Sequence, residues 1–147
     1  MMIQFIVGFF ATLSFAILFS APKRQLVFCG LTGAAGWIVY LLLVQNDSGI
    51  ALANLAATFV LTLMARIFAA RERHPVTVYL LSGIFPLVPG AGIYYTSYYF
   101  IMHDMTNFAR YGSETVIIAG SIALGIVFGF ALPQKMFNAL PQLGHKR

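Results

Sequence analysis

The 147-residue chain is 60% hydrophobic and only 9% charged, with a formal net charge of +5. Soluble globular domains carry about 25% charged residues, so this composition excludes a soluble domain and indicates an integral membrane protein. The basic residues lie in short breaks between apolar runs rather than on one folded face, which excludes a nucleic-acid-binding role. These runs leave no room for a second unit, and we expect residues 1–147 to form a single transmembrane domain.

Five apolar runs follow one another along the chain. Each is close to the length of about 20 residues that crosses a membrane as a helix. The runs therefore predict an all-α integral membrane protein with five transmembrane helices. No basic segment precedes the first run, so we expect a retained helix there rather than a signal peptide. The runs cover residues 2–20, 26–44, 49–70, 76–102 and 115–132.

Small residues indicate where these helices pack against one another. In the fifth run, Ser121, Gly125 and Gly129 recur at four-residue spacing and share one helix face. The second run carries Gly30 and Gly33, followed by further small residues. Small residues on one face let helix backbones approach closely. We interpret both stripes as packing surfaces rather than as parts of a substrate path.

The placement of Lys and Arg predicts the orientation of the chain in the membrane. Cytoplasmic loops hold an excess of these residues. Eight of the nine basic residues fall on one side of the five-span arrangement. Only Arg110 falls on the other side, together with Asp47, Asp104 and Glu114. We therefore expect the N-terminus outside the cytoplasm and the C-terminus inside it.

The fourth run is interrupted near its middle by the segment Pro-Leu-Val-Pro-Gly-Ala-Gly at 86–92. Proline lacks a backbone donor and clashes with the preceding turn, and it pushes the residue before it away from the helix. The Pro-x-x-Pro-Gly motif therefore predicts a broken fourth helix made of two halves. Within a membrane, broken backbone is tolerated only where it is buried in protein or lines a watery cavity.

This break is the predicted functional site, because the second half-helix would present its positive N-terminal end at mid-membrane, where an anionic group can bind. The alternative is a structural kink that neighbouring helices satisfy. Arg66 is most simply an inside-positive anchor, and alternatively it contacts a substrate or an anionic lipid head group. The residues predicted to bind substrate are Ser82, Pro86, Pro89, Gly90, Ala91, Gly92, Thr96 and Ser97.

The sequence carries no signature of an enzyme, a metal site or a cofactor site. It has no P-loop, no Gly-x-Ser-x-Gly, no His-Glu-x-x-His and no pair of carboxylates. The histidines His74, His103 and His145 are scattered, and Cys29 is the only cysteine. No Asp or Glu lies in the central part of an expected span, so we expect no proton relay within this chain.

Several segments together resemble a known family. The chain carries Ala-Arg at 65–66, Arg-His-Pro at 73–75 and Phe-Pro-Leu-Val-Pro-Gly at 85–90. With Pro-Lys-Arg at 22–24 and the glycine-rich stretch 30–37, these segments resemble the threonine/serine exporter family, most closely its small, YjjB-like subunit type. The resemblance implies export of threonine and serine, or of dicarboxylates such as succinate, across the bacterial inner membrane. It also implies a separately encoded, larger membrane subunit, because full-length members fuse two membrane modules.

Three functions are open at this stage. The leading hypothesis is a transporter subunit that exports small amino or carboxylic acids together with a second membrane subunit. The alternatives are a non-transporting scaffold or assembly subunit, and a self-associating homo-oligomeric channel. The break at 86–92 favours a transporter or a channel over a scaffold. The lack of charge in the middle of the expected spans favours dependence on a partner.

Overall fold

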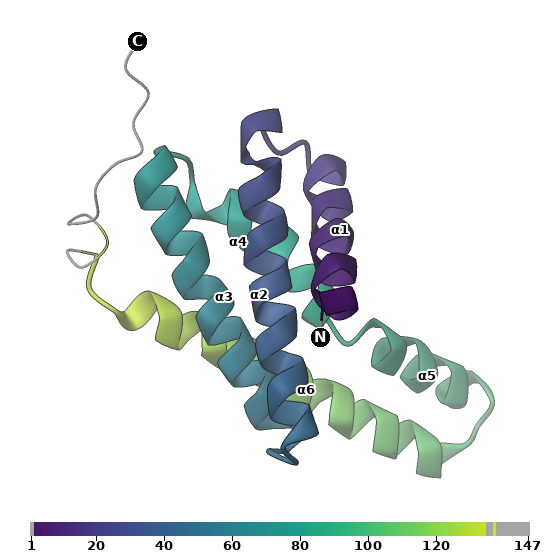
Figure 1. Cartoon of the computed structure of the whole chain (residues 1–147). Coiled ribbons are helices and arrows are strands. Elements are labelled where there is room, and N and C mark those ends of the chain that lie inside the picture. The colour runs from purple at the N-terminus through teal and green to yellow at the C-terminus, as the bar shows by residue number, and fades with distance from the viewer. Residues whose placement is uncertain (1, 135–136, 138–147) are drawn as a thin grey trace.

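The computed structural model describes residues 2–134 and residue 137, and these are all-helical apart from short turns. Figure 1 shows α2 between α1 and α3, with α5 lying along the first half of α6 at one side of the molecule. In chain order, the elements are α1 (Met2–Leu18), the 3₁₀ turn η1 (Lys23–Gln25), α2 (Leu26–Gln45), α3 (Ile50–Glu72), α4 (Val76–Ile84), the 3₁₀ turn η2 (Phe85–Leu87), α5 (Gly90–Ile101) and α6 (Met105–Ala131).

The turns between the helices follow from the local sequence. Pro22 and Pro75 stand directly before η1 and α4, where a proline costs no helical hydrogen bond. Gly49 precedes α3 with φ at 78°, a conformation that glycine adopts without strain. At its other end, α3 stops at Arg73, which adopts the left-handed conformation. These short links bring consecutive helices side by side.

The contact between α1 and α2 depends on glycines of α2. A Cβ atom added at Gly30 would lie 2.6 Å from the ring of Phe9, and one added at Gly33 would overlap Thr12. Thr12 itself is fully buried and donates its hydroxyl to the carbonyl of Gly8. The prediction that the small residues of the second run form a packing surface is therefore confirmed.

The contact between α3 and α6 also depends on small residues that let the two helices approach closely. Ser121, Gly125 and Gly129 are all buried, as their spacing predicted. A Cβ atom at Gly129 would lie 2.5 Å from Thr62 of α3, and one at Gly125 would lie 2.9 Å from Thr58. Both threonines are fully buried and donate their hydroxyls to carbonyls of their own helix. The backbones of α3 and α6 therefore approach closely, and the hydroxyls of these two threonines are hydrogen-bonded.

The fourth apolar run forms two helices rather than one. The α-helix ends at Ile84, η2 continues to Leu87, and α5 begins at Gly90. The segments Val76–Leu87 and Gly90–Ile101 are bent by 53° relative to each other. Val88 is extended between them, which is the conformation that the following Pro89 imposes on its neighbour.

The last helix begins ten residues earlier than the fifth apolar run predicted. A tight turn connects α5 to α6, and Asp104 caps α6 by accepting a hydrogen bond from the backbone amide of Asn107 at 3.1 Å. The Asn107 side chain donates to the second oxygen of the same carboxylate at 2.7 Å. These bonds hold the pKa of Asp104 below its ordinary value. Hydropathy located only the apolar part of this helix, because its first two turns are polar.

Length and composition identify this chain as a multi-pass membrane protein. The helices Lys23–Gln45, Ile50–Glu72 and Met105–Ala131 are each long and apolar enough to cross a membrane. The bent pair Val76–Leu87 and Gly90–Ile101 adds a fourth candidate span if its two parts count as one. The apolar helix α1 has 17 residues, which is at the lower end of the range that spans a bilayer, about 17–25 residues.

Candidate functional site

The break between α4 and α5 leaves backbone donors free at the start of α5. The amide of Gly90 is already used, because it donates to the carbonyl of Val88 at 2.8 Å. The amide of Ile93 donates to the carbonyl of Pro89 at 3.0 Å. The amides of Ala91 and Gly92 lie between these two and have no acceptor among the described residues. The amides of Ala91 and Gly92 therefore have the capacity to bind an anion at the N-terminal end of the second half-helix.

One cavity lies beneath the break, on the side of α2 and α3. Its volume is about 180 Å³, and it is lined by Pro86 and Pro89 on one side and by Trp37, Tyr40 and Asn54 on the other. Asn54 is only 2% exposed, and its side-chain amide donates to the carbonyl of Ile50. The broken backbone therefore borders a partly polar cavity inside the helix bundle.

A second cavity lies on the other side of the break, between α5 and α6. Its volume is about 280 Å³, and α5 contributes Ala91, Gly92 and Tyr95 to its wall. Two residues, Pro89 and Ile118, line this cavity as well as the first one. The break therefore separates two neighbouring cavities. From α6, the second cavity receives Tyr111, Glu114, Thr115 and Ile118.

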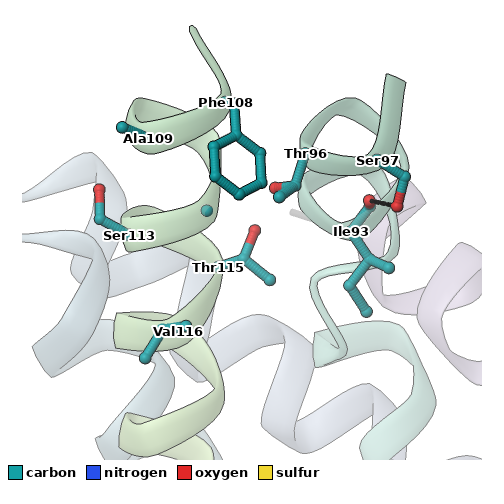
Figure 2. Close-up of a pocket in the computed structure, with 9 residues that line it drawn as sticks. Ile93, Thr96, Ser97, Phe108, Ala109, Ser113, Thr115 and Val116 are labelled. Carbon is teal, nitrogen blue, oxygen red and sulfur yellow. Dashed lines mark hydrogen bonds between the residues drawn. The ribbon is translucent and has the colours of Figure 1, made fainter. Parts of the chain in front are cut away.

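A third cavity, of about 430 Å³, also lies between α5 and α6, on the other side of their contact from the second cavity. Figure 2 shows Thr96 of α5 and Phe108 and Thr115 of α6 between the two helices. Thr96 and Ser97, both predicted to bind substrate, line this cavity rather than the one at the start of α5. Their hydroxyls donate to the carbonyls of Gly92 and Ile93, so their oxygens remain as acceptors.

Two other predicted residues do not line these cavities, although Gly90 stands next to the lining residues Pro89 and Ala91. Ser82 is 1% exposed in the core and donates its hydroxyl to the carbonyl of Val78. Gly90 is exposed at the start of α5, and a Cβ atom added there would meet nothing within 4 Å. The structure thus brings Pro86, Pro89, Ala91 and Gly92 together around the break, and it places Ser82 in a structural position.

Arg66 lies at the far end of α6, where it binds backbone rather than the break. Its guanidinium donates to the carbonyls of Gly129 and Leu132 at 2.6 and 2.8 Å. It also donates to the side chain of Gln134 and lies over the ring of Phe137 at 4.2 Å. Arg66 is only 4% exposed. A cation at the C-terminal end of a helix is stabilised by the carbonyls there, so these contacts account for its burial.

Sequence reasoning missed the α6 side of the site. Tyr111, Glu114 and Thr115 share one helix face with Ile118, since they are separated by three or four residues. The predicted span began at residue 115, which placed Glu114 in a connecting loop. The helical spacing of these residues within 105–118 is the sequence signal that could have revealed this face.

The sequence was compared with known families, proteins and solved structures. Residues 4–131 match the family described as "Threonine/Serine exporter, ThrE". An uncharacterized protein of Haemophilus influenzae is 28% identical over 127 residues, which are 84% of this chain and 43% of that protein. The chain thus spans less than half the length of this curated relative. No solved structure matches. Because the family match covers most of the chain, the protein belongs to the threonine/serine exporter family.

Proposed function

We propose that this chain is a subunit of a membrane exporter of small amino or carboxylic acids such as threonine, serine or succinate. It acts as a transporter rather than an enzyme. The observation that carries this proposal is the broken helix, whose second half starts with two free amides in the wall of a cavity. A half-helix that begins within a membrane protein is suited to bind a carboxylate, and threonine, serine and succinate all carry one.

A larger membrane subunit of the same family is the partner that we propose. The matched region covers only 43% of the Haemophilus influenzae relative, which leaves room in that protein for a second membrane module. In addition, α5 buries none of its residues within this chain. A helix with such an exposed surface is suited to contact another protein.

Co-purification separates this proposal from its alternatives. Tagged chain is extracted from membranes of cells that express it at its native level. A second membrane protein of the family in the eluate supports the two-subunit exporter. An oligomer of this chain alone, with substrate flux when reconstituted, supports the homo-oligomeric channel instead. A co-purifying partner that transports equally well without this chain supports the scaffold.

We further propose five spans, with α1 crossing as a short helix and α4 and α5 together forming the fourth span. The N-terminus lies outside the cytoplasm, and the membrane is the bacterial inner membrane. The distribution of Lys and Arg supports this orientation. The test places single cysteines in a Cys29→Ser chain and labels intact cells with a membrane-impermeant maleimide. Asn46→Cys and Thr106→Cys should react, and Lys23→Cys should not; the reverse pattern contradicts the orientation.

Gly90→Leu tests the site itself. The position has open space in this chain, so the variant should fold and insert normally. The added side chain would lie beside the amides of Ala91 and Gly92 and block access of a carboxylate. We expect efflux of threonine, serine or succinate from cells to be abolished.

The matched control is Gly120→Leu. Gly120 is also an exposed glycine in a helix, and a Cβ atom there meets nothing within 4 Å. It lies in α6 but lines none of the three cavities described above. Efflux should persist in this control. Normal efflux by a correctly inserted Gly90→Leu chain would contradict the assignment of the site to the start of α5.

A further inference from the structure

The first half of the broken helix ends with two unpaired carbonyl groups. A helical carbonyl accepts from the amide four residues later, or from the amide three residues later in a 3₁₀ turn. The carbonyl of Pro86 lacks both donors. Pro89 has no amide hydrogen, and the amide of Gly90 donates to the carbonyl of Val88 instead. The carbonyl of Leu87 also accepts no hydrogen bond among the described residues.

These carbonyls belong to residues that face the interior of the bundle. Leu87 is only 5% exposed, and buried backbone carbonyls are nearly always paired with a protein group, a water molecule or an ion. Pro86 and Leu87 both line the cavity of about 180 Å³ beneath the break. The carbonyl end of a helix also carries a partial negative charge. The missing partner of these carbonyls is therefore expected in this cavity.

Asn54 of α3 adds a third acceptor from another wall of the same cavity. Its side-chain nitrogen donates to the carbonyl of Ile50 at 2.8 Å, so its side-chain oxygen is free to accept. This oxygen has no donor among the described residues, although Asn54 is only 2% exposed. Among those residues, the only fully enclosed side-chain nitrogen or oxygen atoms without a partner are Nε of Arg66 and Nε of Arg71. The oxygen of Asn54 therefore opens on a space, and of the three cavities Asn54 lines only the one beneath the break.

The occupant of this cavity has to satisfy acceptors rather than donors. Trp37 uses its only side-chain donor on Gln4, and the amide of Asn54 already donates to Ile50. Within the described part of the chain, no carboxylate lines the cavity, whereas protein sites for Ca²⁺ and Mg²⁺ normally include carboxylates. Neutral carbonyl oxygens bind monovalent cations, both in the filters of potassium channels and at the broken helices of transporters.

We propose that the side-chain oxygen of Asn54 and the carbonyls of Pro86 and Leu87 bind a sodium ion, with water completing its coordination. The cavity of about 180 Å³ has room for the ion and a few waters, each of which occupies about 30 Å³ in the liquid. The site goes beyond the proposed function, because it takes an ion rather than the exported substrate. In that function the substrate carboxylate binds to amides of the second cavity. One carbon atom joins the carboxylate of an amino acid to its ammonium group, so the ammonium group stays on that side of the break.

Trp37 supplies the readout, because it is the only tryptophan of the chain and lines the cavity. The full-length chain in lipid nanodiscs is titrated with NaCl, which replaces choline chloride so that the ionic strength stays constant. Binding of radiolabelled Na⁺ is measured in parallel. We expect a saturable change of Trp37 fluorescence with Na⁺. Asn54→Leu keeps the approximate size of the side chain but removes its oxygen, and it should raise the Kd for Na⁺ by about tenfold or more.

Two further variants keep this test interpretable. Thr32→Val is the matched control, because Thr32 is fully buried and donates to the carbonyl four residues earlier, as Asn54 does. Thr32 lines none of the three cavities, so the Kd for Na⁺ should stay unchanged. Pro89→Ala tests the backbone acceptors independently, including the case in which Asn54→Leu does not fold. It supplies an amide that the carbonyl of Pro86 can accept, and it should weaken Na⁺ binding.

Three outcomes would overturn the inference. The first is the lack of saturable Na⁺ binding by the unchanged chain. The second is that Asn54→Leu or Pro89→Ala, correctly folded, binds Na⁺ as tightly as Thr32→Val does. The third is displacement of Na⁺ by an equal concentration of methylammonium, which would assign the cavity to the ammonium group of the substrate. None of them refutes the proposed function, which the efflux of Gly90→Leu cells tests separately.

Discussion

Gly125 offers the sharpest test of how this bundle is held together. A Cβ atom at this position would lie 2.6 Å from the carbonyl oxygen of Leu55 and 2.9 Å from Cβ of Thr58. The first contact is to a backbone atom and the second is to the Cβ atom of a β-branched side chain, so neither group can move away easily. Gly125→Ala therefore forces α6 away from α3.

The size of the effect follows from these distances. An ordinary contact for a Cβ atom begins near 3.4 Å, so α6 must shift by roughly 0.8 Å at this point. Such overpacking costs about 1–3 kcal/mol. The shift also lengthens the nearby hydrogen bond from Arg66 to the carbonyl of Gly129, which is 2.6 Å. We therefore expect a loss in the upper half of that range.

The assay is unfolding by a denaturing detergent in mixed micelles, followed by the fluorescence of Trp37, the only tryptophan. The control is Gly120→Ala in the same helix, where an added Cβ atom meets no atom within 4 Å. This control should be as stable as the unchanged chain or slightly more stable, since alanine favours the helix. A Gly125→Ala chain whose unfolding free energy is within about 0.5 kcal/mol of the unchanged chain would refute the close-packing argument.

Three further predictions concern polar groups. Arg66→Met removes the donors that bind the end of α6 and should lower the unfolding free energy by about 3 kcal/mol. Arg66→Lys should recover only part of this loss, because an ammonium group lacks the planar fork of donors of the guanidinium. Tyr79→Phe leaves the side-chain oxygen of buried Gln25 without its donor and should cost about 1–2 kcal/mol in the same assay. The amides of Asn107 lower the pKa of Asp104, so its stabilisation of the α5–α6 turn is complete above pH 3.8 and declines as the pH falls through the lower folded-state pKa. Hydrogen exchange of the Asn107 amide should show this decline in the unchanged chain and not in Asp104→Asn; equal profiles would contradict it.

The features that the sequence predicted well are those set by local chemistry. Pro86 and Pro89 break the helix whatever surrounds them, because the missing donor and the ring clash belong to proline itself. The buried face of Ser121, Gly125 and Gly129 follows from helical spacing alone. Neither prediction required knowledge of the neighbouring helix.

The features that the sequence could not predict depend on which helix faces meet. Thr96 and Gly92 are four residues apart in α5, but the contact with α6 passes between them, so they line different cavities. Asn54 lines a cavity beneath the break only because α3 packs there. Hydropathy placed the start of the last span at 115, since a window of apolar residues does not register a polar extension of the same helix.

The structure accommodates the two charges associated with α6, those of Arg66 and Glu114, in different ways. Arg66 carries a buried positive charge, and the carbonyls of Gly129 and Leu132 together with the side chain of Gln134 surround it with acceptors. Its charge is therefore compensated within the chain. Glu114 carries the opposite charge and lies in α6 itself; it is exposed, lines the cavity between α5 and α6, and has no hydrogen-bond donor among the described residues. The chain therefore compensates the buried charge of Arg66 with its own acceptors, whereas the exposed position of Glu114 demands no such compensation within the described residues.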